Sequence, residues 1–354
     1  MNRFSLSHNL LSQLLIFQND NCSQSPPFAP PFFNLKIAGI LSDRLYQCMR
    51  LDSVLFLLTP ENYKYILQYG KIDLFLIEST IQSKIEAWSF AQMAFGEVND
   101  ILNASIALAK KMGIPVVFWK TNSELESPVM DCVIKKCDVL YQTSTQNNSI
   151  YGRKIGFLGE AIQPRHFHPL VHLKEKAENK FVIVDGISNI SQHNENIGIL
   201  SRVDESNLLL IDSTNIHLKK SLEMDRFSKN IFGYVDWKTR INLLRQAKVF
   251  LSLLGCRKSD SLKRWQELEV MAMGIPVIFL GTLDEDDIRK NLVLEFKDPD
   301  NFSQEMVRLE DSLYRLRKSH KLFRQIHSQH TIATRIKKIC QDLNINSEWD
   351  EYPL

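Results

Sequence analysis

The stretch KRWQELEVMAMGIPVI, from Lys263 to Ile278, decides how the rest of the sequence is interpreted. Its pattern is helical up to Met273, and Gly274 suits the position that closes a helix. Pro276 then leads a short apolar run typical of a buried strand. Helix, glycine turn and strand in this order predict one step of a parallel α/β sheet.

The charges of the same stretch suggest a ligand. Its helix begins among the cations Arg257, Lys258, Lys263 and Arg264, and a helix N-terminus beside cations is a suitable place for a phosphate. Glu269, further along the helix, can accept hydrogen bonds from the hydroxyl pair of a sugar. The alternative is a surface helix with solvated charges, and spacing alone favours neither interpretation.

Short apolar runs alternate with helical patterns on both sides of this stretch. We expect strands at residues 35–41, 54–58, 73–78, 114–119, 138–142, 154–158, 181–185, 208–212, 249–254, 275–280 and 292–296. We expect helices at residues 61–69, 99–112, 131–136, 238–247, 263–273, 302–320 and 331–343. This alternation, which pauses at 164–180, predicts two successive α/β units with parallel sheets and helices on both faces. Two such domains facing each other make a cleft at the carboxyl ends of their strands.

Composition excludes several classes of protein. The chain has 354 residues, and its 43 Lys and Arg residues nearly balance 41 Asp and Glu residues, which argues against a nucleic-acid binder. No apolar run approaches the ~20 residues of a transmembrane helix, and the N-terminus does not read as a signal peptide. Six cysteines without a CxxC pair predict reduced thiols in a cytoplasmic protein and no zinc site.

The helix and strand around Gly274 resemble the donor-site motif of GT-B glycosyltransferases. Within that fold the chain most resembles the CgeB-like (spore-maturation type) bacterial glycosyltransferases. The resemblance covers about residues 35–343, in the right order. It is carried by IAGILSD at 37–43, LLTPENY at 57–63, DLFLIES at 73–79 with Trp88, GIPVVFW at 113–119, AIQPR at 161–165 with His168 and Pro169, and His330-Thr331 with Arg335 and Ile339.

The resemblance implies an architecture and an activity. The expected fold is α/β with two Rossmann-like domains facing a cleft (GT-B) and a C-terminal helix that crosses back to the first domain. The expected parts are an N-terminal arm or linker at 1–33, an acceptor-side domain at 34–170, a nucleotide-sugar domain at 175–329, and a helix and tail at 330–354. The expected activity is transfer of a sugar from a nucleotide-sugar to a glycan, lipid-linked or protein acceptor, without a metal or other cofactor.

The same resemblance implies roles for individual residues of the donor site. Glu269 would hold the ribose or sugar hydroxyls, while Lys263 and Arg264 would neutralise the departing diphosphate in place of a metal. Gly186 would let the chain approach the donor closely, Tyr234 would lie beside the nucleotide base, and Gly274 belongs to the donor-site motif.

Other polar and aromatic residues have two interpretations each. Glu78 ends an expected strand, where it either caps a neighbouring helix or acts as the base for an acceptor hydroxyl. Trp88 and Trp119 suit packing better than sugar stacking. The spacing of His166, His168 and His172 does not suit a known metal site.

Departures from the family pattern keep a second hypothesis open. The family's proline and histidine are missing from residues 120–127, and Ser261 and Gln266 stand where related enzymes carry glutamate and arginine. These changes favour a catalytically inactive GT-B-like protein that acts as a binding or assembly partner. A nucleotide-sugar epimerase is a third possibility. The expected partners are a nucleotide-sugar and an acceptor, without nucleic acid, and peripheral membrane contact is left open.

Overall fold

The computed structural model describes residues 34–79, 83–89, 91–92, 95–121, 127–143, 149–150, 153–168, 182–185, 198, 200–204, 208–212, 231–234, 237–245, 247–252, 261–280, 283, 293–296 and 299–345. All of them belong to the compact unit Phe32–Leu354. Gly186, His172 and the expected arm at 1–33 lie outside the described residues, as do the side chains of Lys263 and Tyr234.

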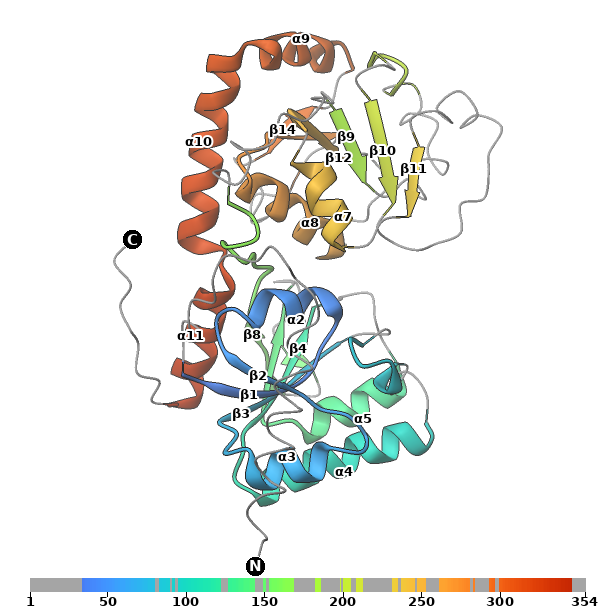
Figure 1. The fold of residues 1–354 in the computed structure, drawn as a ribbon, viewed down its shortest axis with the longest axis vertical. Coiled ribbons are helices and arrows are strands. Elements are labelled where there is room, and N and C mark those ends of the chain that lie inside the picture. Colours follow the sequence, from blue (N-terminus) through green and yellow to red (C-terminus); the bar gives the residue numbers. More distant parts are fainter. Residues whose placement is uncertain are drawn as a thin grey trace, which may run out of the picture. The chain divides into compact units, whose positions relative to one another are not determined.

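The first sheet has six parallel strands in the order β2-β1-β3-β4-β5-β8 (Figure 1). They are β1 (Lys36–Ile40), β2 (Val54–Leu57), β3 (Leu74–Glu78), β4 (Val116–Lys120), β5 (Val139–Gln142) and β8 (Gly156–Phe157). The associated helices are α2 (Asp43–Met49), α3 (Tyr63–Tyr69), the short η2 (Glu86–Trp88), α4 (Glu97–Lys111), α5 (Pro128–Lys136) and α11 (Ile332–Leu343). A two-stranded antiparallel ribbon, β6 (Ser149–Ile150) with β7 (Arg153–Lys154), precedes β8.

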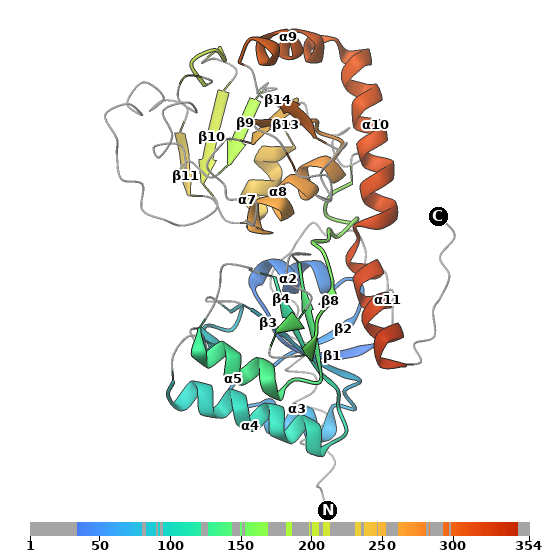
Figure 2. The same ribbon diagram turned by 180° about the vertical axis from the view of Figure 1, so that it is seen from behind.

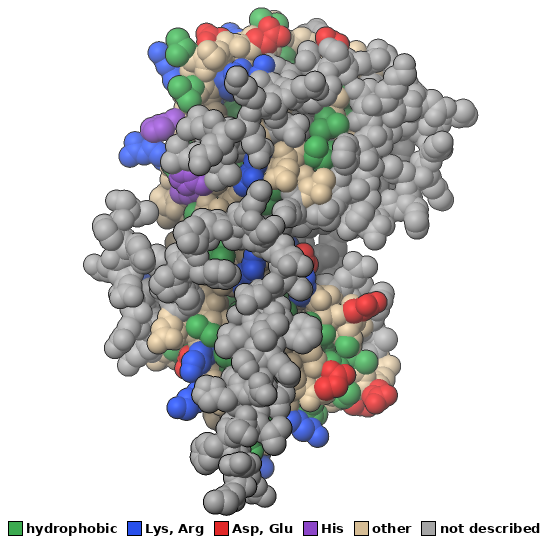
Figure 3. All heavy atoms as spheres, viewed as in Figure 1, with side chains coloured by type: hydrophobic (Ala, Val, Ile, Leu, Met, Phe, Trp, Pro, Cys, Tyr) green, Lys and Arg blue, Asp and Glu red, His purple; other side chains and the backbone are tan. Residues whose placement is uncertain are grey.

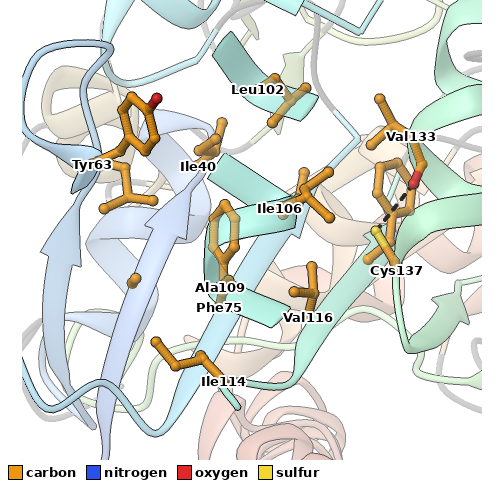
Figure 4. Packing of buried hydrophobic residues seen from close by; sticks show 14 of the residues in the cluster. Ile40, Tyr63, Phe75, Leu102, Ile106, Ala109, Ile114, Val116, Val133 and Cys137 are labelled. Carbon is orange, nitrogen blue, oxygen red and sulfur yellow. Dashed lines mark hydrogen bonds between the residues drawn. The ribbon is translucent and has the colours of Figure 1, made fainter. Parts of the chain in front are cut away.

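Both faces of this sheet are buried, because successive residues of a strand point to opposite sides and both sets are apolar. Phe75 of β3 shares an apolar cluster with Ile106 of α4 and Val133 of α5 (Figure 4). Its neighbour Leu76 lies in a second cluster with residues of α2 and with Ile336 of α11. Helix α11 therefore covers the first sheet, as predicted, on the side opposite α4 and α5 (Figures 1 and 2).

The second sheet repeats this architecture with six parallel strands in the order β11-β10-β9-β12-β13-β14. They are β9 (Val182–Asp185), β10 (Leu208–Asp212), β11 (Ile231–Tyr234), β12 (Val249–Ser252), β13 (Val277–Leu280) and β14 (Leu294–Phe296). The helices are α7 (Trp237–Leu244), α8 (Ser261–Ala272), α9 (Pro299–Glu310) and α10 (Ser312–Gln329). Residues of α7, α8 and α10 share one apolar cluster, and residues of α9 lie in another. The predicted α/β fold with parallel sheets is confirmed.

The expected single helix at 302–320 is wrong, because the chain forms two helices there. Helix α9 ends at Glu310, and Asp311 is the N-cap of α10. Its Oδ1 accepts hydrogen bonds from the backbone N–H groups of Leu313 (2.8 Å) and Tyr314 (3.4 Å). A carboxylate that satisfies the first donors of a helix starts that helix at a defined residue, so Asp311 is a boundary rather than one more polar position.

Candidate functional site

Parallel sheets bind ligands where the strand order reverses, and in the first sheet that point lies between β1 and β3. Glu78 ends β3 there and is 4% exposed. Its Oε2 accepts from the backbone N–H of Ser42 (2.6 Å), and its Oε1 accepts from the hydroxyl of Thr121 (2.9 Å). Glu78 thus ties the carboxyl ends of β1, β3 and β4 together.

The charge state of Glu78 is set by opposing effects. Burial raises the pKa of its carboxyl group, while the hydrogen bonds from Ser42 and Thr121 and the nearby Arg44 counteract that rise. Because Ser42 is also the N-cap of α2, these contacts suit the capping interpretation. A raised pKa equally suits a general base, so the catalytic role of Glu78 stays a prediction.

In the second sheet the strand order reverses between β9 and β12. Ser252 ends β12, and its hydroxyl donates to Oε1 of Glu267 on α8. Both side chains are buried, which places a second carboxylate at a carboxyl strand end. The sequence analysis assigned no role to Glu267.

Glu269 lies in the middle of α8 and is fully buried between two arginines. Its Oε2 accepts from Nη1 of Arg240 on α7 at 2.5 Å. Its Oε1 lies 3.4 Å from Nε of Arg44 on α2. Two guanidinium groups thus share one carboxylate. Within the described part of the chain, Oε1 of Glu269 and Nη1 of Arg44 are buried without a hydrogen-bond partner.

Sequence reasoning missed both arginines. Arg44 comes three residues after the end of the expected strand at 35–41, which places it close to a carboxyl strand end, and this was the signal that could have found it. Arg240 lies in an expected helix and carries no local signal at all. Its importance comes from being 1% exposed, since a buried guanidinium needs a carboxylate partner.

The first turn of α8 contacts segments that belong with the first sheet. Nε of Arg264 lies 2.8 Å from Oε1 of Glu160, and both side chains are buried. The ring of Trp265 lies 5.9 Å from that of Trp119 at an angle of 38°. The predicted diphosphate ligand Arg264 is thus already ion-paired. Trp119 and Trp88 are buried core residues, which confirms the packing interpretation.

Two motifs of the family resemblance, far apart in the sequence, meet in the structure. The backbone N–H of Ile162 donates to the carbonyl of His330 (2.8 Å), and that of Ile332 donates to the carbonyl of Ile162 (2.9 Å). Arg335 donates to the carbonyls of Gly159 and Glu160, each at 2.8 Å. The segment that leaves the first sheet (159–162) and the segment that leads back to it (330–335) are therefore hydrogen-bonded to each other.

Gly274 closes α8 with φ of +75°, in the left-handed region predicted for it. Its N–H donates to the carbonyl of Met271 (2.9 Å), so its role is to turn the chain into β13. His166 and His168, whose spacing did not suggest a metal site, make other contacts. Nε2 of His166 lies 3.2 Å from the carbonyl oxygen of Gln47, and the His168 ring packs edge-on against Phe323.

A buried carboxyl group lies beside the same passage. Oδ2 of Asp52 accepts a hydrogen bond from Nε2 of Gln163 (2.9 Å), which also donates to the carbonyl of Cys48 (2.7 Å). Asp52 is 4% exposed, and burial raises its pKa to about 6, although Gln163 and Arg165 act against the rise. The folded protein therefore holds this proton at pH values at which the unfolded chain has lost it.

We expect this proton to make stability pH-dependent. Between the ordinary pKa of an aspartate and about 6 the folded state binds more protons, so its stability falls as the pH rises through this window. Asp52→Asn keeps the acceptor and removes the titration. Relative to this variant, the wild-type free energy of unfolding should fall by up to about 3 kcal/mol between pH 4 and pH 7. Urea unfolding at several pH values measures the difference, and parallel curves for the two proteins would contradict the prediction.

The fold can be compared with known proteins. No protein-family model matches the chain, and no curated protein matches it. Among solved structures, HepE from Anabaena in complex with UDP-glucose is similar with a TM-score of 0.55 and 9% identity, over 88% of this chain and all of HepE. A glycosyltransferase from Rickettsia africae is similar with a TM-score of 0.53 and 11% identity, over 88% of this chain and 99% of that one. The chain has the GT-B fold.

The predicted fold class is therefore confirmed. At 9–11% sequence identity, the similarity to these structures shows the fold alone. Membership of the CgeB-like group, the domain boundaries and the roles of the donor-site residues stay predictions. Among the helices of the described segments, none is long and apolar enough to cross a membrane.

Proposed function

We propose that this GT-B protein transfers a sugar from a nucleotide-sugar donor to a glycan, lipid-linked or protein acceptor, as the CgeB-like glycosyltransferases do. The observation that carries the proposal is the cluster of Arg44, Glu269 and Arg240. It keeps a buried hydrogen-bond acceptor and a buried donor unsatisfied within the described residues. Each such atom costs about 1–3 kcal/mol, and a ligand with hydroxyl and phosphate groups would satisfy both.

The proposed roles follow from charge and hydrogen-bonding capacity. Glu269 accepts hydrogen bonds from the ribose or sugar hydroxyls, and Arg44 joins Lys263 and Arg264 in stabilising the charge that develops on the departing diphosphate. These cations supply positive charge from the chain itself, so neither a metal nor another cofactor is part of the proposal. Gly186 lets the chain approach the donor closely, Tyr234 lies beside the nucleotide base, and Gly274 belongs to the donor-site motif. Glu78 receives the proton of the acceptor hydroxyl.

A specific observation favours the second candidate, an inactive GT-B-like binding or assembly partner. The main charges of the site are paired within the chain, Glu269 by Arg44 and Arg240, and Arg264 by Glu160. Charges that are already paired need no ligand to neutralise them. The departures at Ser261 and Gln266 point in the same direction.

Nucleotide-dependent stabilisation of the purified protein distinguishes the two candidates. The melting temperature is measured with UDP, GDP, CDP, ADP and their common sugars. A ligand at ~100 times its dissociation constant adds ~2.7 kcal/mol. We expect a rise with one nucleotide that is lost in Glu269→Gln. Glu305→Gln, which alters a buried carboxylate of α9, is the matched control and should keep the rise. No rise with any nucleotide would contradict the proposal and favour the inactive candidate.

A further inference from the structure

Positive charge is concentrated at the C-terminal end of the chain. Residues 312–341 contain eight of the 43 Lys and Arg residues and none of the 41 Asp and Glu residues. This segment consists of α10 and most of α11. The rest of the chain is therefore net negative, so the near-neutral total hides a strongly basic segment.

The outer face of α10 presents much of this charge to solvent. Helical spacing places Leu313, Arg317, Lys321, Arg324 and Ser328 along one stripe, and all five are exposed. The opposite face is buried through Leu322 and Ile326, which lie in the apolar cluster that includes residues of α8. Lys, Arg and His side chains gather at the edge of the molecule where α10 lies (Figure 3). The helix is thus amphipathic, with a basic outer face.

The cations of this face are not neutralised by neighbours. Arg317, Lys321 and Arg324 make no hydrogen bond or ion pair with any residue that the structure describes. An open hollow of about 480 Å³ lies on the face. It is lined by His320, Lys321, Arg324, Gln325, Ser328 and Gln329. Like charges held together without acidic partners repel one another, so this surface is complementary to an anionic partner.

Apolar side chains extend the same face. Leu313, one turn before Arg317, is 65% exposed, and Leu316, immediately before Arg317, is 64% exposed. Val307 near the end of α9 is 67% exposed. Exposed leucines beside a row of Lys and Arg are typical of a helix that lies in a membrane interface, where the apolar groups enter the acyl boundary and the cations meet lipid phosphates. A nucleic acid would leave these leucines unused.

We propose that the outer face of α10 docks this protein onto an anionic lipid membrane. The leucines at its start insert between headgroups, and Arg317, Lys321 and Arg324 bind lipid phosphates, with the hollow as the place for one headgroup. Because the buried side of α10 packs on α8, docking would hold the helix of the proposed donor site near the membrane surface. The surface itself is independent of donor binding.

Vesicle binding without any nucleotide tests the proposal, so its result is separate from that of the proposed function. The full chain is sedimented with vesicles of phosphatidylcholine alone or of phosphatidylcholine mixed equally with phosphatidylglycerol. We expect binding to the mixed vesicles only, weakening as salt is added. The triple variant Arg317→Gln, Lys321→Gln, Arg324→Gln should bind about 100-fold more weakly, because each cation near an anionic surface contributes about a factor of five.

Matched variants separate this face from general charge effects. The control triple variant is Lys64→Gln, Lys71→Gln, Lys111→Gln. It removes the same charge from exposed residues in the part of the chain that forms the first sheet and its helices, and it should leave vesicle binding within twofold. Leu313→Ser with Leu316→Ser should weaken binding but keep its salt dependence. Melting curves show that each variant is folded. The proposal would be overturned if the triple variant of α10 and the control triple variant bound vesicles equally well. Binding of the protein to duplex DNA without binding to vesicles would overturn it too.

Discussion

Replacing Arg240 by Met should destabilise the protein by about 3–5 kcal/mol, because it leaves the fully buried carboxylate of Glu269 without its closest cation. Arg44, 3.4 Å from the other carboxylate oxygen, would be the remaining counter-charge. The free energy of unfolding in urea measures the loss. Arg308→Met is the matched control, because Arg308 pairs with Glu305 but is 67% exposed, and it should cost at most about 1 kcal/mol.

A double substitution tests whether the unpaired charge is the cause. Arg240→Met combined with Glu269→Leu removes both charges and should be more stable than Arg240→Met alone, since apolar groups can replace a buried ion pair. If Arg240→Met costs less than about 1 kcal/mol, or if the double variant is no better, the pair does not carry this energy.

Replacing Glu78 by Gln should lower the rate of sugar transfer about 10²–10⁴-fold while leaving the protein folded, if the carboxylate takes the acceptor proton. The amide keeps one oxygen to accept from Ser42 or Thr121 and loses the capacity to take a proton. The assay uses the nucleotide that raises the melting temperature, and measures transfer with donor in excess. Full activity in Glu78→Gln would leave Glu78 with the capping role alone.

The pH dependence of the reaction gives Glu78 a second test. The hydroxyl of Thr121 stabilises the charged carboxylate, so Thr121→Val should raise the pKa of Glu78 further. Because a base acts in its deprotonated form, the acidic limb of the pH–rate profile should move to higher pH. A residue with a merely structural role would change the stability without moving this limb.

Local sequence patterns predicted most of the sheets because parallel strands are buried on both faces and therefore appear as short continuous apolar runs. The runs at 54–58, 73–78 and 114–119 correspond to β2, β3 and β4. Strand β11 was missed, since Ile-Phe-Gly-Tyr is short and contains a glycine. Helix α2 was missed as well, because seven residues give too few turns for a period to be visible.

Some residues of the candidate site could be found from the sequence, and their partners could not. Sequence patterns drew attention to Glu78 at a strand end and to Glu269 before a glycine turn, because both positions are marked by local structure. They did not find the partners of these residues, which are 29 residues away for Arg240 and 43 for Thr121. The sequence around a carboxylate does not show which distant cation or hydroxyl will pair with it once it is buried.

The sequence by itself determined most of the succession of strands and helices, the closure of α8 at Gly274 and the basic character of residues 312–341. These depend on hydrophobic period, backbone preference and charge, which are properties of neighbouring residues. Only the tertiary structure decided that Arg44 and Arg240 share Glu269, that Arg264 pairs with Glu160, and that Arg335 ties the two passages of the chain together. Desolvation makes each buried charge require a partner, but folding of distant segments selects which one it receives.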